Sequence, residues 1–136
     1  MRNMSFMLTT PQFVDGSKDV TRRIGWLALK VGDLLMGAEK CQGLGPGGKM
    51  KRLGAIRVKS VRREKLEAMT LRWKYGLEEC RREGFPEMNP AQFVVMFCAS
   101  HKVKVGGRVR NVKPQDVVTR IEFEHLNVES ELENIR

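Results

Sequence analysis

Histidine is scarce in this chain of 136 residues, since only His101 and His125 are present. Two histidines are too few for histidine-rich metal sites. The three cysteines, Cys41, Cys80 and Cys98, are odd in number and widely spaced, which excludes a disulfide framework and a four-cysteine zinc site. Cys98 and His101 form one Cys-x-x-His pair, which we interpret as the face of a buried helix. The sequence therefore predicts no metal and no cofactor, and free thiols suit the reducing cytoplasm.

Long hydrophobic runs are also missing. The longest, from Phe93 to Ala99, has seven residues, whereas a membrane helix needs about 20. The apolar part of the N-terminus is only Phe6 to Leu8, too short for a signal peptide. A (β/α)8 barrel needs roughly 200 residues or more. We therefore expect one domain over residues 1–126, an acidic tail over 127–136, no membrane partner and a cytoplasmic location.

The positive charge is confined to the first half of the chain. Residues 1–65 hold 14 Lys and Arg against 5 Asp and Glu, whereas residues 66–136 hold 11 of each. The net charge of +9 thus belongs to the first 65 residues. A one-sided positive field attracts polyanions. The alternative is that the lysines only keep the protein soluble.

Short strands dominate the predicted secondary structure. Period-two or apolar patterns predict strands over 5–8, 20–24, 34–38, 53–61 and 117–126, with a hairpin over 102–112. Helices are predicted to begin at Thr10-Pro11, near Leu66 and at Asn89-Pro90. About six strands and three helices with little βαβ rhythm predict an α+β fold, a small β-barrel with helices packed at its rim.

Apolar stripes mark the inner faces of two helices. The first is formed by Leu66, Met69, Trp73, Leu77 and Cys80, and Gly84 is predicted to end that helix. The second comprises Phe93, Met96, Phe97 and Ser100. We interpret both stripes as core.

Cations alternate with valines in two predicted strands. Around Gly106-Gly107 the hairpin would place Lys102, Lys104, Arg108 and Arg110 on one exposed face, where like charges repel unless an anion lies over them. In the strand over 53–61, Arg57 and Lys59 face away from Ile56 and Val58. These six cations are candidate nucleic-acid contacts.

A glycine-rich segment imitates a phosphate-binding loop. Residues 43–50 fit the pattern GxxxxGK, but Met50 stands where a Ser or Thr must hold magnesium. A period-two strand follows, whereas such a loop must open a helix. We interpret the segment as a hairpin tip whose lysines can still touch phosphate.

The run from Phe13 to Arg23 carries the most information. It contains Lys-Asp-Val-Thr-Arg-Arg and leads through Leu29 to Asp33 into the segment 34–36. It resembles the opening of ASCH domains, whose signature is a Lys-x-x-Thr-x-Arg run and a Gly-Asp turn into a strand. Later pieces agree in order over about residues 5–126: Ile56 to Val61, Glu83 to Phe85, Asn89 to Phe93 and Val118 to Phe123. The segments 42–48 and 102–112 depart from that pattern as local elaborations.

This resemblance implies a fold akin to the RNA-binding PUA domains, a β-barrel with a cleft beside its first helix. It implies RNA or nucleotide binding, with RNA or a nucleoside as partner. Some small bacterial members are metal-independent amidohydrolases acting on N-acetylated cytidine through a Lys, a Thr and a Glu, and another is reported as a ribonuclease. In this sequence the three residues match Lys18, Thr21 and Glu83.

The residues allow both catalysis and binding. Neighbouring cations lower the pKa of a lysine, so Lys18 could act as base, Thr21 could attack or bind an amide carbonyl, and Glu83 could protonate the leaving amine. An extended strand would place Lys18 and Thr21 on opposite faces, so the turn before Lys18 must hold it off the strand. Alternatively Lys18, Arg22 and Arg23 contact phosphate. A third interpretation is a protein-interaction module.

Few aromatic residues remain for stacking on a base. The chain has six Phe, two Trp and one Tyr. We interpret Phe93, Phe97, Trp73 and Phe123 as buried. The candidates for stacking on a base are Trp26 and Tyr75. Trp26 follows Arg22 and Arg23 closely, so we prefer it.

Overall fold

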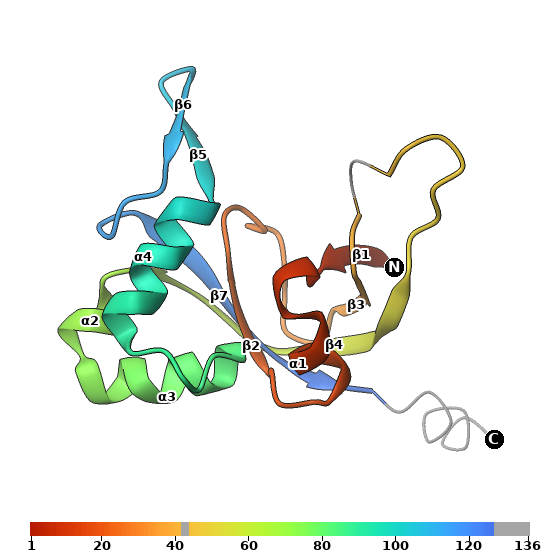
Figure 1. Ribbon diagram of the computed structural model, residues 1–136, viewed down its shortest axis with the longest axis horizontal. Coiled ribbons are helices and arrows are strands. Elements are labelled where there is room, and N and C mark those ends of the chain that lie inside the picture. The colour runs from red at the N-terminus through yellow and green to blue at the C-terminus, as the bar shows by residue number, and fades with distance from the viewer. Residues whose placement is uncertain (42–43, 127–136) are drawn as a thin grey trace.

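The computed structural model describes residues 1–41 and 44–126 and contains one curled five-stranded sheet (Figure 1). Its strand order is β1 (Arg2–Ser5), β3 (Leu34–Ala38), β4 (Arg52–Lys65), β7 (Val117–His125) and β2 (Val20–Arg23). Only β1 and β3 pair in parallel. The α+β prediction is confirmed. The sheet is a half-barrel with β1 and β2 at its edges, so the barrel is not closed.

Helices cover this sheet at both ends. The 3-10 helix η1 (Met7–Thr9) and α1 (Thr10–Val14) lie toward β1 and β3, whereas α2 (Ala68–Leu71), α3 (Trp73–Glu83) and α4 (Pro90–Ser100) gather at the opposite end (Figure 1). Each end has its own apolar core. Phe6, Phe13, Leu35, Ile56 and Phe123 belong to the first core. Leu66, Met69, Cys80, Phe93 and Phe97 belong to the second.

Several boundaries follow the local sequence signals. Asn89 caps α4 through a capping box with Gln92, and Gly84 ends α3 with φ +98°, in the left-handed region. The strand predicted over 34–38 is β3, and β4 buries Ile56 and Val58 as its alternation predicts. Within the glycine-rich segment, the described residues connect β3 to β4 without a helix. Residues 42–43 and the acidic tail over 127–136 lie outside the described residues.

Other predictions were wrong. The strand predicted over 5–8 ends at Ser5, because Met7–Thr9 forms η1. The helix predicted from Leu66 breaks at Arg72 into α2 and α3, and Trp73 is 46% exposed. The break turns α3 so that Glu79 and Glu83 face inward beside Cys80. Hydrophobic periodicity could not reveal a helix whose buried face carries two carboxylates.

The basic hairpin forms as predicted, but its cations do not share one face. β5 (Lys102–Val105) pairs with β6 (Arg108–Asn111) across the Gly106-Gly107 turn, with Lys102 opposite Asn111 and Lys104 opposite Val109. Residues directly opposite share a face. The two lysines of β5 therefore face one way, and the two arginines of β6 face the other. A two-residue turn pairs even positions with odd ones, which the prediction overlooked.

Candidate functional site

Lys18 lies in the loop between α1 and β2, so the geometric objection to its pairing with Thr21 is resolved. Its backbone N–H donates to the carbonyl of Gln12 at 3.1 Å, and its carbonyl lies 2.8 Å from Nε2 of His125. These two contacts fix the loop before the strand begins at Val20. The side chain of Lys18 is thus directed by the loop rather than by strand alternation.

Lys18 and Glu83 form a buried ion pair. The Nζ of Lys18 donates to Oε1 of Glu83 at 2.9 Å and to the carbonyl oxygen of Glu83 at 2.7 Å. That carbonyl has no intrahelical donor because Gly84 ends α3, so Lys18 also satisfies the helix C-terminus. Burial lowers the pKa of Lys18, while the charge of Glu83 opposes this effect. The structure thus brings together two of the three residues that the family resemblance singles out.

Thr21 and Arg23 lie side by side on β2. Nε of Arg23 donates to Oγ1 of Thr21 at 3.0 Å, and the guanidinium lies 4.8 Å from the ring centroid of Phe6. Among the described residues, no carboxylate pairs with Arg23. Burial lowers its pKa to about 10. An arginine with an unpaired fork is well suited to bind an anion or a carbonyl oxygen.

A pocket of about 210 Å³ joins these groups. Its polar wall includes Lys18, Thr21, Arg22, Arg23 and Glu83, with Ser5 and Thr9 beside them. Its apolar and aromatic wall includes Phe6, Phe85, Phe93, Met96, Phe97 and His101. A concave site with apolar walls and a few convergent polar groups is typical of small-ligand binding.

Arg22 is not available to phosphate, which corrects its prediction as a nucleic-acid contact. Its side chain is fully buried, and its two terminal nitrogens donate to Glu83 at 3.0 Å, Glu64 at 2.7 Å and Glu79 at 2.6 Å. Although burial opposes it, the charges of these three carboxylates raise the pKa of Arg22. Because Arg22 holds Oε2 of Glu83 and Lys18 holds Oε1, the Glu83 carboxylate has a fixed orientation.

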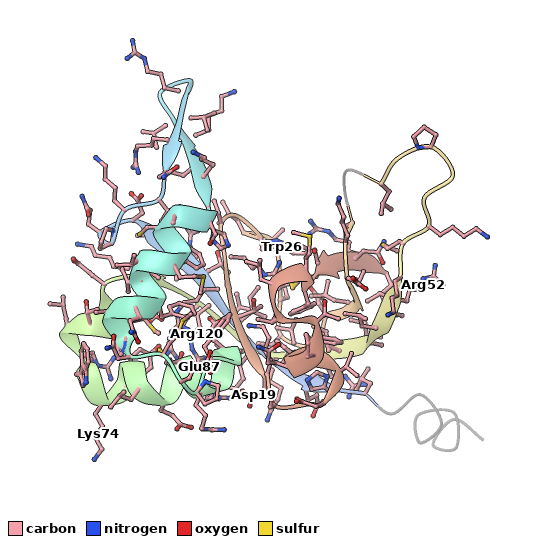
Figure 2. The ribbon with its side chains drawn as sticks, in the orientation of Figure 1. Asp19, Trp26, Arg52, Lys74, Glu87 and Arg120 are labelled. Carbon is pink, nitrogen blue, oxygen red and sulfur yellow. The ribbon has the colours of Figure 1, made fainter. Side chains whose placement is uncertain are left out.

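The ion-pair network continues away from the pocket. Glu79 also accepts from Arg120 of β7, which is labelled in Figure 2, and Tyr75 Oη lies 3.1 Å from Arg22. Burial raises the pKa of Glu79, but hydrogen bonds and charge from Arg120 and Arg22 outweigh burial and lower it to about 2. Sequence reasoning missed this network, because nothing in the sequence pairs charges from α3, β2 and β7. Tyr75 is engaged in it rather than placed for stacking.

Trp26 lies outside the set of residues that line the pocket. It is partly buried against the first core, its φ is +56°, and the guanidinium carbon of Arg2 lies 4.2 Å from its ring centroid. The aromatic wall instead includes Phe97 and His101, whose rings stack with centroids 3.7 Å apart. Phe97 also belongs to the second core, as its stripe predicts, whereas from the sequence we consider His101 only as half of a zinc site.

His101 has a defined hydrogen-bonding role. Its Nδ1 lies 2.9 Å from the carbonyl oxygen of Phe97, which can only accept, and 2.9 Å from Oγ of Ser100, which can donate or accept. Burial lowers the pKa of His101, which favours the neutral ring. In the tautomer in which Nδ1 donates to the Phe97 carbonyl, Nε2 is an acceptor.

The other predicted nucleic-acid residues lie away from the pocket lining. Arg57 and Lys59 of β4 lie near Glu124 and Glu122, at 3.2 and 3.7 Å. The exposed residues Lys102, Lys104 and Arg108 lie on the hairpin, where Arg110 pairs with Asp116 at 2.7 Å.

The thiols of Cys41, Cys80 and Cys98 are all free, as their spacing predicts. Within residues 1–41 and 44–126, no group of three or more His, Cys, Asp and Glu side chains is arranged to hold a metal ion. In the same residues, no helix is long and apolar enough to cross a membrane. The chain matches no family model, no curated protein and no solved structure with which it was compared.

Proposed function

We propose that the pocket binds a single nucleobase, presented by a nucleoside, a nucleotide or an unpaired position of RNA. The observation that carries this proposal is the combination of an aromatic wall with the unpaired fork of Arg23. Flat aromatic side chains provide stacking surfaces for a base, and polar groups at the rim of the ring read its edge.

Donors and acceptors are both present at the polar wall. Arg23 and Lys18 donate, whereas the carboxylate of Glu83 accepts. The edges of nucleobases carry both kinds of group, so a mixed wall fits a base better than a wall of cations alone would. The resemblance to ASCH domains supports the same proposal.

Amide hydrolysis is a second candidate function, favoured by one observation: the buried pair of Lys18 and Glu83 lines the same pocket as Thr21. A lysine whose pKa is lowered by burial can accept a proton, and a carboxyl group can deliver one. Arg23 donates to Thr21 Oγ1 at 3.0 Å, and a cation at this oxygen stabilises the alkoxide that forms when the hydroxyl loses its proton.

The steps use only these side chains and water. Transfer of a proton from the Lys18 ammonium to the Glu83 carboxylate, which it contacts at 2.9 Å, gives a neutral amine and a neutral carboxyl group. The amine of Lys18 then takes the hydroxyl proton of Thr21, whose oxygen attacks the amide carbonyl carbon. Glu83 gives its proton to the leaving nitrogen as the C–N bond breaks, and the ion pair of Lys18 and Glu83 is restored. Water then hydrolyses the threonine ester, which releases the carboxylic acid and restores the hydroxyl. On N-acetylated cytidine the products are acetate and cytidine.

Calorimetric titration with the four ribonucleosides, their monophosphates and N-acetylated cytidine tests the binding proposal. We expect saturable binding of at least one nucleoside, weakened by Arg23→Gln and unchanged by Arg81→Gln, whose side chain pairs with Glu78 on the surface. The absence of binding to every compound would contradict the proposal.

Release of acetate from N-acetylated cytidine tests the second function. We expect turnover that persists in the presence of a chelator, because Lys18, Thr21 and Glu83 suffice for the steps. Binding of nucleosides without any acetate release would overturn hydrolysis and leave binding intact.

A further inference from the structure

The hairpin of β5 and β6, here called the arm, stands apart from the rest of the molecule. Figure 1 shows it projecting away from the curled sheet beyond the end of α4. The side chains near its tip are exposed to solvent: Val105 is 51% exposed and Val109 is 67% exposed. An isolated two-stranded ribbon of this length is marginally stable in water, so the arm must be held at its base.

The base of the arm is anchored in three ways. The backbone N–H of Val112 donates to the carbonyl of His101 at 3.1 Å, and the buried side chain of Val112 belongs to the second core. Val103 packs against the same core. Both terminal nitrogens of Arg110 donate to Asp116, at 2.7 and 2.9 Å. These contacts fix the position of the base of the arm, while its other side chains remain exposed.

Those other side chains give the arm a positive charge on both faces. From Lys102 to Lys113 the sequence contains no acidic residue. Among the described residues, Lys102, Lys104 and Arg108 have no carboxylate partner, and all three are exposed. Lys102 and Lys104 face one way, and Arg108 faces the other. A narrow ribbon with cations on both faces attracts a polyanion.

The arm begins where the pocket ends. His101 lines the pocket, and Lys102, the next residue, opens β5. A base seated against His101 therefore has its sugar-phosphate backbone within reach of the root of the arm. A base inside a duplex cannot enter a pocket without being extruded, so the strand that carries it is unpaired.

We propose that the arm binds the phosphodiester backbone of a single-stranded nucleic acid whose unpaired base occupies the pocket. The proposal rests on the proposed function and narrows it, because the ligand is then a position within a strand rather than a free nucleoside. RNA and DNA share the phosphodiester backbone that the arm would bind, so the test below measures the affinity for strands of both kinds.

The test compares single strands of about eight nucleotides, a length that one small domain can cover, with the matching free nucleosides. The strands are homopolymers of each base, as RNA and as DNA. The arm variant combines Lys102→Gln, Lys104→Gln and Arg108→Gln. The matched control combines Arg63→Gln, Lys65→Gln and Lys74→Gln, three exposed cations on β4 and α3 that leave the same net charge; Figure 2 shows Lys74 pointing away from the arm.

We expect the arm variant to bind strands at least about tenfold more weakly, and the slope of log affinity against log salt to fall by about 2, the value for three lost phosphate contacts on a single strand. Its affinity for the nucleoside and its melting temperature should stay unchanged, and the control should change strand affinity less than about twofold. Equal weakening of the arm variant and the control would overturn the proposal, as would unchanged strand affinity in the arm variant. Failure of the wild type to bind any nucleoside or strand would overturn the proposed function itself.

Discussion

The Nζ atom of Lys18 lies 2.9 Å from Oε1 of Glu83, although 65 residues separate them in the sequence. Neither group is exposed, and neither charge is left without a partner, because the helix-terminal carbonyl of Glu83 and the guanidinium of Arg22 complete the arrangement. Two oppositely charged groups held together beside a pocket are the feature from which the following predictions start.

Lys18→Arg tests whether residue 18 acts as a base or only supplies a positive charge to the pocket. Arginine keeps the positive charge beside Glu83 but cannot give up its proton near neutral pH. If the pocket hydrolyses amides, we expect Lys18→Arg to abolish acetate release from N-acetylated cytidine. Glu83→Gln should slow release by about 100-fold, the usual size of lost general-acid help. Thr21→Ser should retain part of the rate, and full activity of Lys18→Arg would exclude Lys18 as the base.

Arg22→Met tests whether the buried network supports the fold. The substitution leaves Glu64, Glu79 and Glu83 without their shared cation. Removal of one partner from a buried ion pair typically costs about 3–5 kcal/mol. Urea unfolding should therefore give a much lower free energy of unfolding for Arg22→Met than for Arg81→Met, whose exposed guanidinium pairs with Glu78 on the surface of α3. Comparable stability of the two variants would show that the network contributes little.

The stability of the protein should fall in acid partly through Glu79. Its pKa of about 2 in the folded protein lies below its ordinary value of 4.5, so this carboxylate stabilises the fold fully above about pH 4.5. Unfolding takes up a proton at lower pH, and the contribution is lost as the pH falls toward about 2. Urea midpoints measured from pH 6 to pH 3 should fall less steeply for Glu79→Gln than for the wild type. Glu87→Gln, a change at an exposed carboxylate labelled in Figure 2, should follow the wild-type slope.

Gly76→Ala tests the close approach of α3 to its neighbours. A Cβ at this position would lie 1.9 Å from the carbonyl oxygen of Met69 and 2.7 Å from Cγ of Pro90. Backbone must move to admit it, so we expect the melting temperature to fall by several degrees. Gly45→Ala introduces the same methyl group into open space and serves as the control. An unchanged melting temperature in Gly76→Ala would contradict this prediction, because it would mean that α2 and α4 can shift away from α3 without loss of stability.

Local signals predicted the elements whose ends are set by single residues. Asn89 and Pro90 predicted the start of α4, Gly84 predicted the end of α3, and Gly106-Gly107 predicted the turn of the arm. Each signal acts within a few residues, through a cap or a left-handed backbone conformation. The sequence therefore contains enough information for these boundaries.

The composition of the site could be predicted only in part. The pairing of Lys18 with Glu83 was expected from a family resemblance and not from physical reasoning, since no pattern links a loop before β2 to the last residue of α3. The burial of Arg22 was missed because a cation on a short strand ordinarily faces solvent. The three carboxylates that hold it come from β4 and α3, and only the packing of these elements reveals that Arg22 is structural.

Mapping of a bound nucleoside by amide chemical shifts tests the central claim most directly. Uniformly 15N-labelled protein is titrated with each ribonucleoside and with N-acetylated cytidine. We predict that the largest shifts fall on Thr21, Arg23, Phe97 and His101, the residues at the two walls of the pocket. Shifts confined to other surfaces, or none with any compound, would contradict the account.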